Sequence, residues 1–252
     1  MNLTNSNYFS RQANMEYMSV SQFKAFDKCE AAALAELKGE YIKPKTTSML
    51  VGSYVDAYFE GSLDRFIAEN PEVLRKDGGL RSEFRQAEEI IKRIKQDATF
   101  MHLLSGKKQQ IFTGEIEGVK VKIKIDSLLP DAIVDLKVMK DFLPVWKNGE
   151  RMPWFSAWGF DLQGAVYQYI EGNKKPFILA AVTKETVADI QGIEIPQDFL
   201  NERLGYFKGM VGHFDDVKKG LVEPTRCEHC DYCKATKKME VIDARQYYYE
   251  ME

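Results

Sequence analysis

The sequence predicts a single α/β domain built on a mixed, mostly antiparallel sheet of about five strands with helices on its faces. Three observations predict it. The chain has 252 residues, of which 44% are hydrophobic, so it can bury a full core. Between residues 109 and 139 the apolar pattern changes from a helical period to strict alternation. Helical segments precede and follow this region, and no repeat or low-complexity linker divides the chain.

Helices are predicted throughout the first hundred residues. Ser19 is a suitable N-cap for a helix that continues to about Leu37, with Gly39 as its terminator. A second helix is expected over 48–60, and a charge-rich helical segment over 81–104. The polar, irregular residues 1–18 are expected to form a loosely docked N-terminal arm.

Strands and helices are mixed in the rest of the chain. A tight turn at Glu117-Gly118 joins the first two predicted strands. The predicted domain covers residues 19–238, and residues 239–252 are expected to form a C-terminal tail. The expected strands are 109–116, 119–129, 132–139, 176–183 and 186–195, and the expected helices are 159–171 and 196–219.

Composition limits where the protein works and what attracts it. No apolar run approaches the length of a membrane span, and the first residues lack the apolar core of a signal peptide, so a cytoplasmic location without membrane contact is expected. A formal net charge of −3 provides no overall attraction for nucleic acid. Any contact with DNA must therefore use local basic patches.

Two neighbouring predicted strands carry a candidate metal site. Strand side chains alternate between faces, so Asp135 and Lys137 project together while the residues between them enter the core. The preceding strand ends its polar face at Asp126. If the strands are neighbours, the two carboxylates can hold a hard divalent cation beside a lysine, which suits metal-assisted phosphodiester hydrolysis.

An ordinary solvated sheet face would give the same local pattern, and both interpretations stay open from this region alone. The (Asp/Glu)-x-Lys triplet also occurs at Glu36-Leu37-Lys38 and at Asp216-Val217-Lys218. Both of these copies fall in predicted helices, where positions i and i+2 do not share a face. Only the copy at 135–137 lies in a predicted strand behind a second strand that ends in an aspartate.

Other polar and aromatic residues near this region are candidates for DNA contact. Lys120, Lys122 and Lys124 lie on the same strand face as Asp126, where they would meet backbone phosphates without reading sequence. Trp154 and Trp158 offer rings for stacking on exposed bases, although core or loop anchoring is the favoured explanation for both.

The cysteines predict a second metal site. Three of the four lie in Cys227-x2-Cys230-x2-Cys233, and the fourth, Cys29, lies far upstream. In a cytosolic chain this clustering favours metal ligation over disulfides. The spacing is typical of iron–sulfur ligation, and a zinc site with four thiolates is also chemically open. His229 is an alternative ligand, although an exposed loop position suits it better.

Several features occur in one order along the chain, and together they resemble a known nuclease family. The ordered set resembles the RecB-like branch of the PD-(D/E)xK nuclease superfamily and is most similar to phage-type RecE-like exonucleases. It also shares features with iron–sulfur nucleases of the AddB and CRISPR-associated kinds. The resemblance covers roughly residues 19–238. Its parts are Ser19-Val20-Ser21-Gln22-Phe23 with Cys29, the segment 52–60 with Asp56 and Glu60 one turn apart, Asp126, Asp135-x-Lys137, Gln163 with Tyr167, and Cys227–Cys233.

The resemblance implies a restriction-endonuclease-like core and roles for individual residues. Asp126 and Asp135 are implied as ligands of Mg²⁺ or Mn²⁺, and Lys137 as the group that orients the attacking water or stabilises charge. Gln163 and Tyr167 match a Gln-x3-Tyr helix that lines the active site. Asp56 stands where this branch usually has histidine, and an aspartate is itself a competent hard ligand. Cys29, Cys227, Cys230 and Cys233 are implied to hold an iron–sulfur cluster, with Zn²⁺ as the alternative.

The resemblance implies a metal-dependent DNA exonuclease that acts on duplex ends. Little sequence preference is expected, because no base-reading helix is evident in the sequence. The resemblance also implies phage-type recombination, a single-strand annealing protein as partner, and a homo-oligomer. Two alternatives stay open from the sequence. One is a structure-specific or CRISPR-type end-processing nuclease, and the other is a non-catalytic iron–sulfur or zinc protein that binds nucleic acid.

Overall fold

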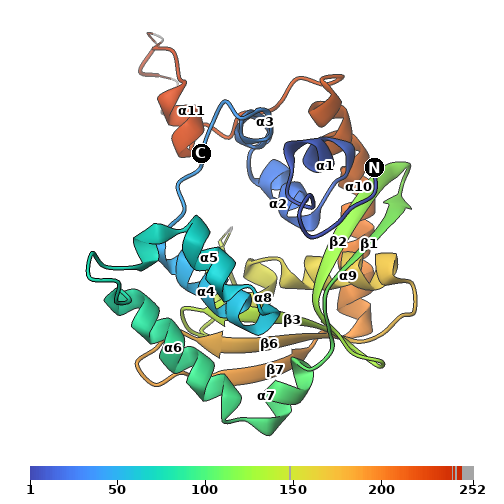
Figure 1. Cartoon of the computed structure of the whole chain (residues 1–252). Coiled ribbons are helices and arrows are strands. Elements are labelled where there is room, and N and C mark those ends of the chain that lie inside the picture. The colour runs from blue at the N-terminus through green and yellow to red at the C-terminus, as the bar shows by residue number, and fades with distance from the viewer. Residues whose placement is uncertain (148, 240, 242, 246–252) are drawn as a thin grey trace.

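A five-stranded mixed sheet in the order β1-β2-β3-β6-β7 forms the centre of the molecule (Figure 1). The computed structural model describes residues 1–147, 149–239, 241 and 243–245. β3 runs parallel to β6, and the other neighbouring strands are antiparallel, which confirms the predicted sheet. The strands are β1 (Lys107–Ile116), β2 (Val119–Leu128), β3 (Ile133–Met139), β6 (Phe177–Thr183) and β7 (Ile190–Glu194).

The β1–β2 hairpin is long and regular, whereas β2 and β3 share only a short ladder. Glu117 and Gly118 both have positive φ, as a two-residue hairpin turn of the favoured hand requires. The described β2–β3 register consists of Ser127 opposite Val134 and Leu128 opposite Ile133. Beyond these pairs, on the side of Asp126, the two strands separate.

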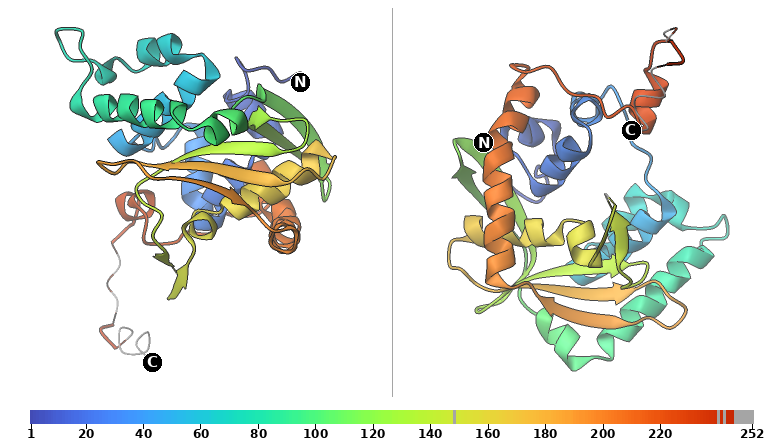
Figure 2. Two further views of the ribbon diagram at one scale, coloured as in Figure 1. Left: turned by 90° about the horizontal axis from the view of Figure 1, so that it is seen from below. Right: turned by 180° about the vertical axis from the view of Figure 1, so that it is seen from behind.

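Helices cover both faces of the sheet and make three layers (Figure 2). One face carries α4 (Thr47–Glu60), α6 (Ser82–Lys95) and α7 (Ala98–Leu103). The other face carries α2 (Val20–Lys28), α3 (Glu30–Lys38), α9 (Phe160–Glu171) and α10 (Gln197–Lys219). The shorter elements are α1 (Arg11–Glu16), α5 (Leu63–Glu69), the 3-10 turn Pro71–Val73, α8 (Trp154–Ala157), α11 (Asp231–Ala235) and a β4 (Val145–Lys147) and β5 (Glu150–Met152) hairpin.

Alternation along β3 divides the hydrophobic core in two. Val134 and Leu136 are buried against the α4 and α6 layer. Ile133 is buried on the opposite face with the α9 and α10 layer. Because strand residues two apart share a face, Asp135 and Lys137 project toward the α9 side. The sheet therefore presents both of these side chains to the same helix.

The helix predicted from Ser19 to about Leu37 is in fact two helices, α2 and α3. Ser19 does cap α2, in a reciprocal capping box with Gln22. Cys29 interrupts the helix with extended backbone angles of φ −168° and ψ 106°. The residue thus ends α2 and precedes α3, and the single-helix prediction is wrong at the position of the distal cysteine.

The N-terminal residues are packed against the sheet, which corrects the expectation of a loosely docked arm. Tyr8 is 5% exposed, and Ala13 and Met18 are fully buried. Met18 exchanges backbone hydrogen bonds with β2 through Lys120 O and Lys122 N. Most of the predicted tail 239–252 lies outside the described residues. Among the described residues, no helix combines the length and apolarity needed to cross a membrane.

Gly164 of α9 sets how closely this helix approaches the sheet. A Cβ atom at this position would lie 2.4 Å from the ring of Phe177, which is fully buried on β6. We expect Gly164→Ala to lower the free energy of unfolding by about 1–3 kcal/mol, measured by urea denaturation, because overpacking forces the helix away. Gly209→Ala is the matched control, since Gly209 is an exposed residue of α10 and an added Cβ would have no other atom within 4 Å. Equal stability of the two variants would contradict this close packing.

Candidate active site and cysteine centre

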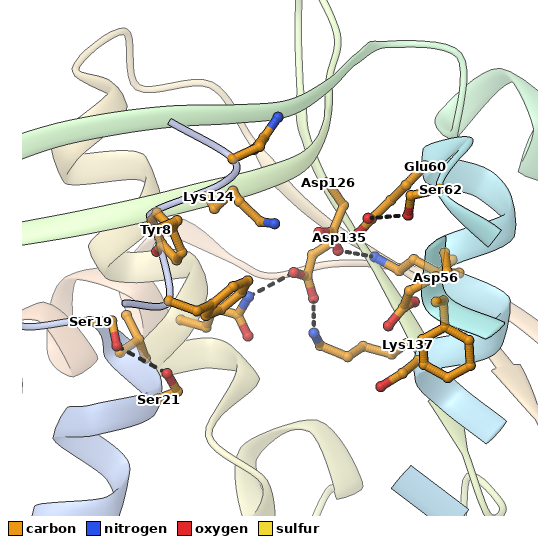
Figure 3. A pocket seen from close by; sticks show the side chains of 18 of the residues that line it. Tyr8, Ser19, Ser21, Asp56, Glu60, Ser62, Lys124, Asp126, Asp135 and Lys137 are labelled. Carbon is orange, nitrogen blue, oxygen red and sulfur yellow. Dashed lines mark hydrogen bonds and ion pairs between the residues drawn. The ribbon is translucent and has the colours of Figure 1, made fainter. Parts of the chain in front are cut away.

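The separation of β2 from β3 creates a site occupied by two carboxylates (Figure 3). Asp126 lies on β2 directly beyond the last ladder pair, and its Oδ2 accepts a hydrogen bond of 3.2 Å from the backbone N–H of Leu136. The N–H and C=O of one strand residue point to the same edge. The Leu136 carbonyl therefore also faces the opening, where it adds a neutral oxygen beside the two carboxylates.

Asp135 is held by two side-chain donors. Its carboxylate is 2% exposed. Gln163 of α9 donates from Nε2 to Asp135 Oδ1 over 2.7 Å, and Lys137 Nζ lies 2.5 Å from Asp135 Oδ2. The sheet and the helix thus fix the orientation of one carboxylate between them.

Helix α4 brings further acidic groups to the opposite side of the site. Asp56 and Glu60 are one helical turn apart and both face the same cavity. Among the described residues, Asp56 Oδ1 is buried and has no hydrogen-bond partner. A buried carboxylate oxygen without a donor is costly in an empty site, and a cation would satisfy it.

All of the predicted catalytic and hard-metal residues line one cavity of about 740 Å³. The cavity lies between the strand opening, α4, α9 and the N-terminal segment, so the structure brings together residues that are far apart in the sequence. They are Asp56, Asp126, Asp135, Lys137, Gln163 and Tyr167.

Burial and mutual repulsion perturb the acidic groups. Burial, followed by the charge of Asp135, raises the pKa of Asp126 to about 7. Burial and the neighbouring Asp126 raise the pKa of Asp56 well above its usual value. Burial lowers the pKa of Lys137, but the charges of Asp135 and Asp126 outweigh this effect, and the net shift is upward. An added divalent cation would remove the repulsion between these carboxylates.

The residues present fit a hard divalent cation. Among the described residues, the acidic side chains do not form a group of three whose oxygens all lie within 4.8 Å of one another. A cation in the strand opening would instead draw on Asp126, Asp135 and the carbonyl of Leu136, with Asp56 facing it from α4. Carboxylate, carbonyl and water oxygens are the ligands that Mg²⁺ and Mn²⁺ prefer.

One of the three lysines predicted to contact phosphates, Lys122, is covered, which corrects that expectation at this position, whereas the side chain of Lys120 is 58% exposed. Lys122 is 1% exposed, and its Nζ donates to Asn14 Oδ1 over 2.7 Å. Lys120 pairs with Glu16 at 3.1 Å. The N-terminal segment packs across this strand face, and of the three lysines Lys124 lines the cavity.

Gln109 also belongs to the site, although no sequence motif singles it out. Its Nε2 donates to Glu60 Oε1 over 2.6 Å and lies 3.4 Å from Asp126 Oδ1. Its backbone φ is +51°, an unfavourable value for a residue with a side chain in the middle of a strand. An amide that bridges two carboxylates orients them without neutralising them.

Lys24 is a second residue that sequence reasoning missed. It lies on α2 and lines the cavity, and its Nζ donates to the carbonyl of Trp158 over 3.2 Å. Burial, followed by the charge of Lys137, lowers its pKa to about 8. A helix that starts at Ser19 and ends at Cys29 carries no sequence signal that would direct Lys24 toward the strands.

The two tryptophans considered for base stacking and the lysines of the two other triplets lie in different environments. Trp154 is buried and stacks on Phe142, so it is a core residue, whereas Trp158 is 57% exposed. The lysines of the two other triplets differ from each other. Lys38 is exposed, but Lys218 is 4% exposed and lies 3.6 Å from Asp215, so it is a structural residue of α10.

The four cysteines converge between α3 and the C-terminal loop. Their ligand atoms all lie within 4.8 Å of one another, and Cys29 Sγ lies 3.6 Å from Cys233 Sγ. All four are free thiols. His229 is exposed and is not part of this compact group. The predicted convergence of Cys29 with the C-terminal cysteines is therefore present in the structure.

The local electrostatics of this group favour a bound cation. Hydrogen bonds from the backbone N–H groups of His229 and Cys230 lower the pKa of Cys227 to about 6. Burial raises the pKa of Cys29 to about 12. Four clustered thiols cannot all ionise without a positive ion, and a thiophilic metal supplies that charge.

The chain matches one known protein family over most of its length. Residues 19–236 match the family described as "PDDEXK-like domain of unknown function (DUF3799)". The chain belongs to this family. The PDDEXK-like assignment confirms the superfamily resemblance and the restriction-endonuclease-like core, and nucleases of this superfamily generally use divalent metals.

A solved structure supports the same PDDEXK-like assignment. The chain is 44% identical to a Eubacterium rectale protein whose crystal structure is provisionally described as that of an exonuclease. The similarity covers 98% of each chain, with a TM-score of 0.93. No curated protein matches the chain. Family and structural similarity together support nuclease activity, for which DNA is the expected substrate.

Asp126→Asn should stabilise the metal-free protein at alkaline pH. The pKa of Asp126 is raised in the folded state, so between its unfolded and folded values the folded state binds more protons, and stability falls as pH rises. The variant lacks this ionisation. We expect its free energy of unfolding at pH 8 to exceed that of the wild type by about 1–3 kcal/mol.

The measurement is thermal unfolding in EDTA from pH 5 to pH 8, repeated with excess Mg²⁺. Mg²⁺ should raise the melting temperature of the wild type more than that of Asp126→Asn. An asparagine variant that is less stable than the wild type in EDTA at pH 8 would contradict the electrostatic account.

Gln109→Ala should weaken Mg²⁺ binding by about 3- to 10-fold, because Glu60 and Asp126 lose their shared donor. Gln109→Gly should show the same loss but unfold at higher temperature than Gln109→Ala, since glycine accepts positive φ. Mg²⁺ titrations of the melting temperature measure both effects. Gln110→Ala is the neighbouring control, because the Gln110 amide bonds to the carbonyl of Lys108. Wild-type Mg²⁺ affinity in Gln109→Ala would show that the bridge has no positioning role.

Proposed function

We propose that this protein is a metal-dependent DNA exonuclease that hydrolyses phosphodiester bonds at duplex ends. The observation that carries the proposal is the convergence of Asp126, Asp135 and Lys137 where β2 separates from β3. Carboxylates at hydrogen-bonded, fixed positions beside an ammonium group are the equipment of metal-assisted phosphate chemistry.

Each residue of the site has a proposed task. Asp126, Asp135 and the carbonyl of Leu136 hold Mg²⁺ or Mn²⁺, and Asp56 completes the acidic lining. When bound, the cation supplies a water of lowered pKa and neutralises charge on the scissile phosphate. Lys137 presents its ammonium group to that phosphate and to the attacking water.

Residues on α9 support this arrangement. Gln163 fixes Asp135 through its 2.7 Å hydrogen bond. Burial, followed by the charge of Asp135, raises the pKa of Tyr167 well above its usual value, so its hydroxyl keeps its proton. The hydroxyl is then a donor suited to a phosphate oxygen in the same cavity.

The walls of the cavity favour a DNA end. Lys24 and Lys124 add positive charge to its lining. Phe9 is 69% exposed at the rim, under the ammonium group of Lys124 at 4.8 Å, and its free ring face suits stacking on a base. A neighbouring cavity of about 450 Å³ shares Tyr8 and Phe9 with the first. The packed N-terminal segment bounds both cavities. This confined space suits one strand of an opened DNA end better than an uninterrupted duplex.

The resemblance adds finer proposals about context. We propose that the product strand feeds phage-type recombination with a single-strand annealing protein, and that the chain acts as a homo-oligomer in the cytoplasm. With a formal net charge of −3, a single copy has no global attraction for DNA, and several copies would add their contacts. Light scattering with and without duplex DNA tests the oligomer.

Asp135→Asn and Lys137→Ala should each reduce Mg²⁺-dependent DNA cleavage by about 100-fold or more, because the first removes a charged metal ligand and the second removes the ammonium group beside the reacting phosphate. Asp131→Asn and Lys140→Ala are matched controls. Asp131 is exposed beyond the end of β2, and the side chain of Lys140 is 93% exposed just beyond β3. Circular dichroism and melting curves confirm folding. Equal activity of site and control variants would favour a non-catalytic nucleic-acid-binding protein.

Linear duplex DNA should be degraded in Mg²⁺, while nick-free closed circles of the same sequence should remain intact. Raising salt from about 50 to about 200 mM should slow degradation at least roughly tenfold if several phosphates are contacted. Agarose gels of both substrates, with EDTA as the control, provide the measurement. Efficient cutting of closed circles would replace the exonuclease proposal with the structure-specific endonuclease alternative.

A further inference from the structure

The sulfur atoms of the cysteine group are too close together for the cluster that the resemblance implies. Cys29 Sγ lies 3.6 Å from Cys233 Sγ and 3.8 Å from Cys230 Sγ. All four sulfurs, including that of Cys227, lie within 4.8 Å of one another. The group therefore surrounds a very small volume.

Two kinds of metal centre need different sulfur spacings. A tetrahedral ion with metal–sulfur bonds of 2.3 Å places its thiolates about 3.8 Å apart. In a four-iron cluster each thiolate binds a different iron, so the cysteine sulfurs stand roughly 6 Å apart. A two-iron cluster separates two pairs of thiolates by a similar distance. The observed spacing matches a single tetrahedral ion and excludes either cluster without movement of the chain.

Interactions that do not involve sulfur fix the segments that carry the cysteines. The backbone N–H of Ala31 donates to Thr225 O over 3.1 Å, and Thr225 N–H donates to Glu30 Oε2 over 2.7 Å. These bonds join the start of α3 to the chain two residues before Cys227. Cys29 and Cys227 are thus brought together by hydrogen bonds that do not involve sulfur, and the short spacing is not produced by contact between thiols alone.

The C-terminal loop is organised in the same way. Arg226 Nη2 donates to the carbonyl of Cys233 over 2.7 Å, which closes the loop on itself. The backbone N–H of Cys230 points at Cys227 Sγ over 3.3 Å, and that of Cys233 points at Cys230 Sγ over 3.5 Å. Backbone donors aimed at sulfur stabilise thiolates.

We propose that Cys29, Cys227, Cys230 and Cys233 bind one tetrahedral Zn²⁺ ion and not an iron–sulfur cluster. The ion joins the α2–α3 junction to the C-terminal loop and closes the group without an open coordination position, as structural zinc sites do. The four cysteines lie outside the set of described residues that line the catalytic cavity.

The decisive experiment is metal analysis of wild-type protein purified in parallel under air and under anaerobic conditions. We expect about one zinc per chain in both preparations, no acid-labile sulfide and no charge-transfer band near 400 nm. Protein refolded with Co²⁺ should show the visible absorption of tetrahedral cobalt thiolate. Two or more irons per chain with a similar amount of sulfide in the anaerobic protein would overturn the proposal.

A conservative variant gives an independent test. Zinc sites accept three cysteines and one histidine, so Cys227→His should keep about one zinc per chain, whereas Cys227→Ser should lose most of it and melt at lower temperature. Lys234→Ser, an exposed residue beside Cys233, is the control and should bind zinc as the wild type does. Circular dichroism is recorded for each variant, so that loss of zinc through unfolding is distinguished from loss of a ligand in a folded protein. A folded Cys227→His protein without zinc would contradict the tetrahedral site.

Discussion

One hydrogen bond organises the site: the backbone N–H of Leu136 donates to the side chain of Asp126 instead of to a β2 carbonyl. A strand that leaves its neighbour exposes backbone donors that must find partners when buried. Asp126 provides one, and its carboxylate is thereby fixed beside Asp135 at the point where the ladder ends. The separation of β2 from β3 thus places Asp126 beside Asp135, and both line the cavity that opens there.

The donors around these acids preserve the charge that a cation needs. Gln163 orients Asp135 and Gln109 bridges Glu60 to Asp126, and both are neutral amides. Lys137 is the cation in direct contact with Asp135. If every carboxylate were paired with lysine or arginine, the site would be stable but unable to attract a metal. Burial and this uncompensated negative charge raise the pKa of Asp126, and within the described part of the chain one buried oxygen of Asp56 has no hydrogen-bond partner.

Local patterning predicted the strands and the two acids, because alternation determines which side chains share a face. It predicted neither the break at Cys29 nor the positive φ of Gln109, since both depend on tertiary contacts that override local preference. Lys122 departs from the predicted stripe of phosphate-binding lysines for a related reason. Lys122 alternates like a solvent-facing residue, but a segment more than a hundred positions away in the chain covers it. Sequence periodicity identifies a non-core face without revealing what packs on it.

Helix α2 links the two proposed metal sites. It begins after Ser19, which lines the catalytic cavity, and ends at Cys29 in the cysteine group. Nine residues of continuous helix transmit position with little bending, and Lys24 projects from its middle into the cavity. The position of Cys29 at the end of α2 therefore helps to set where this helix lies beside the candidate active site. On this account the proposed metal ion at the cysteines is structural, and it fixes the helix that forms one wall of the candidate active-site cavity.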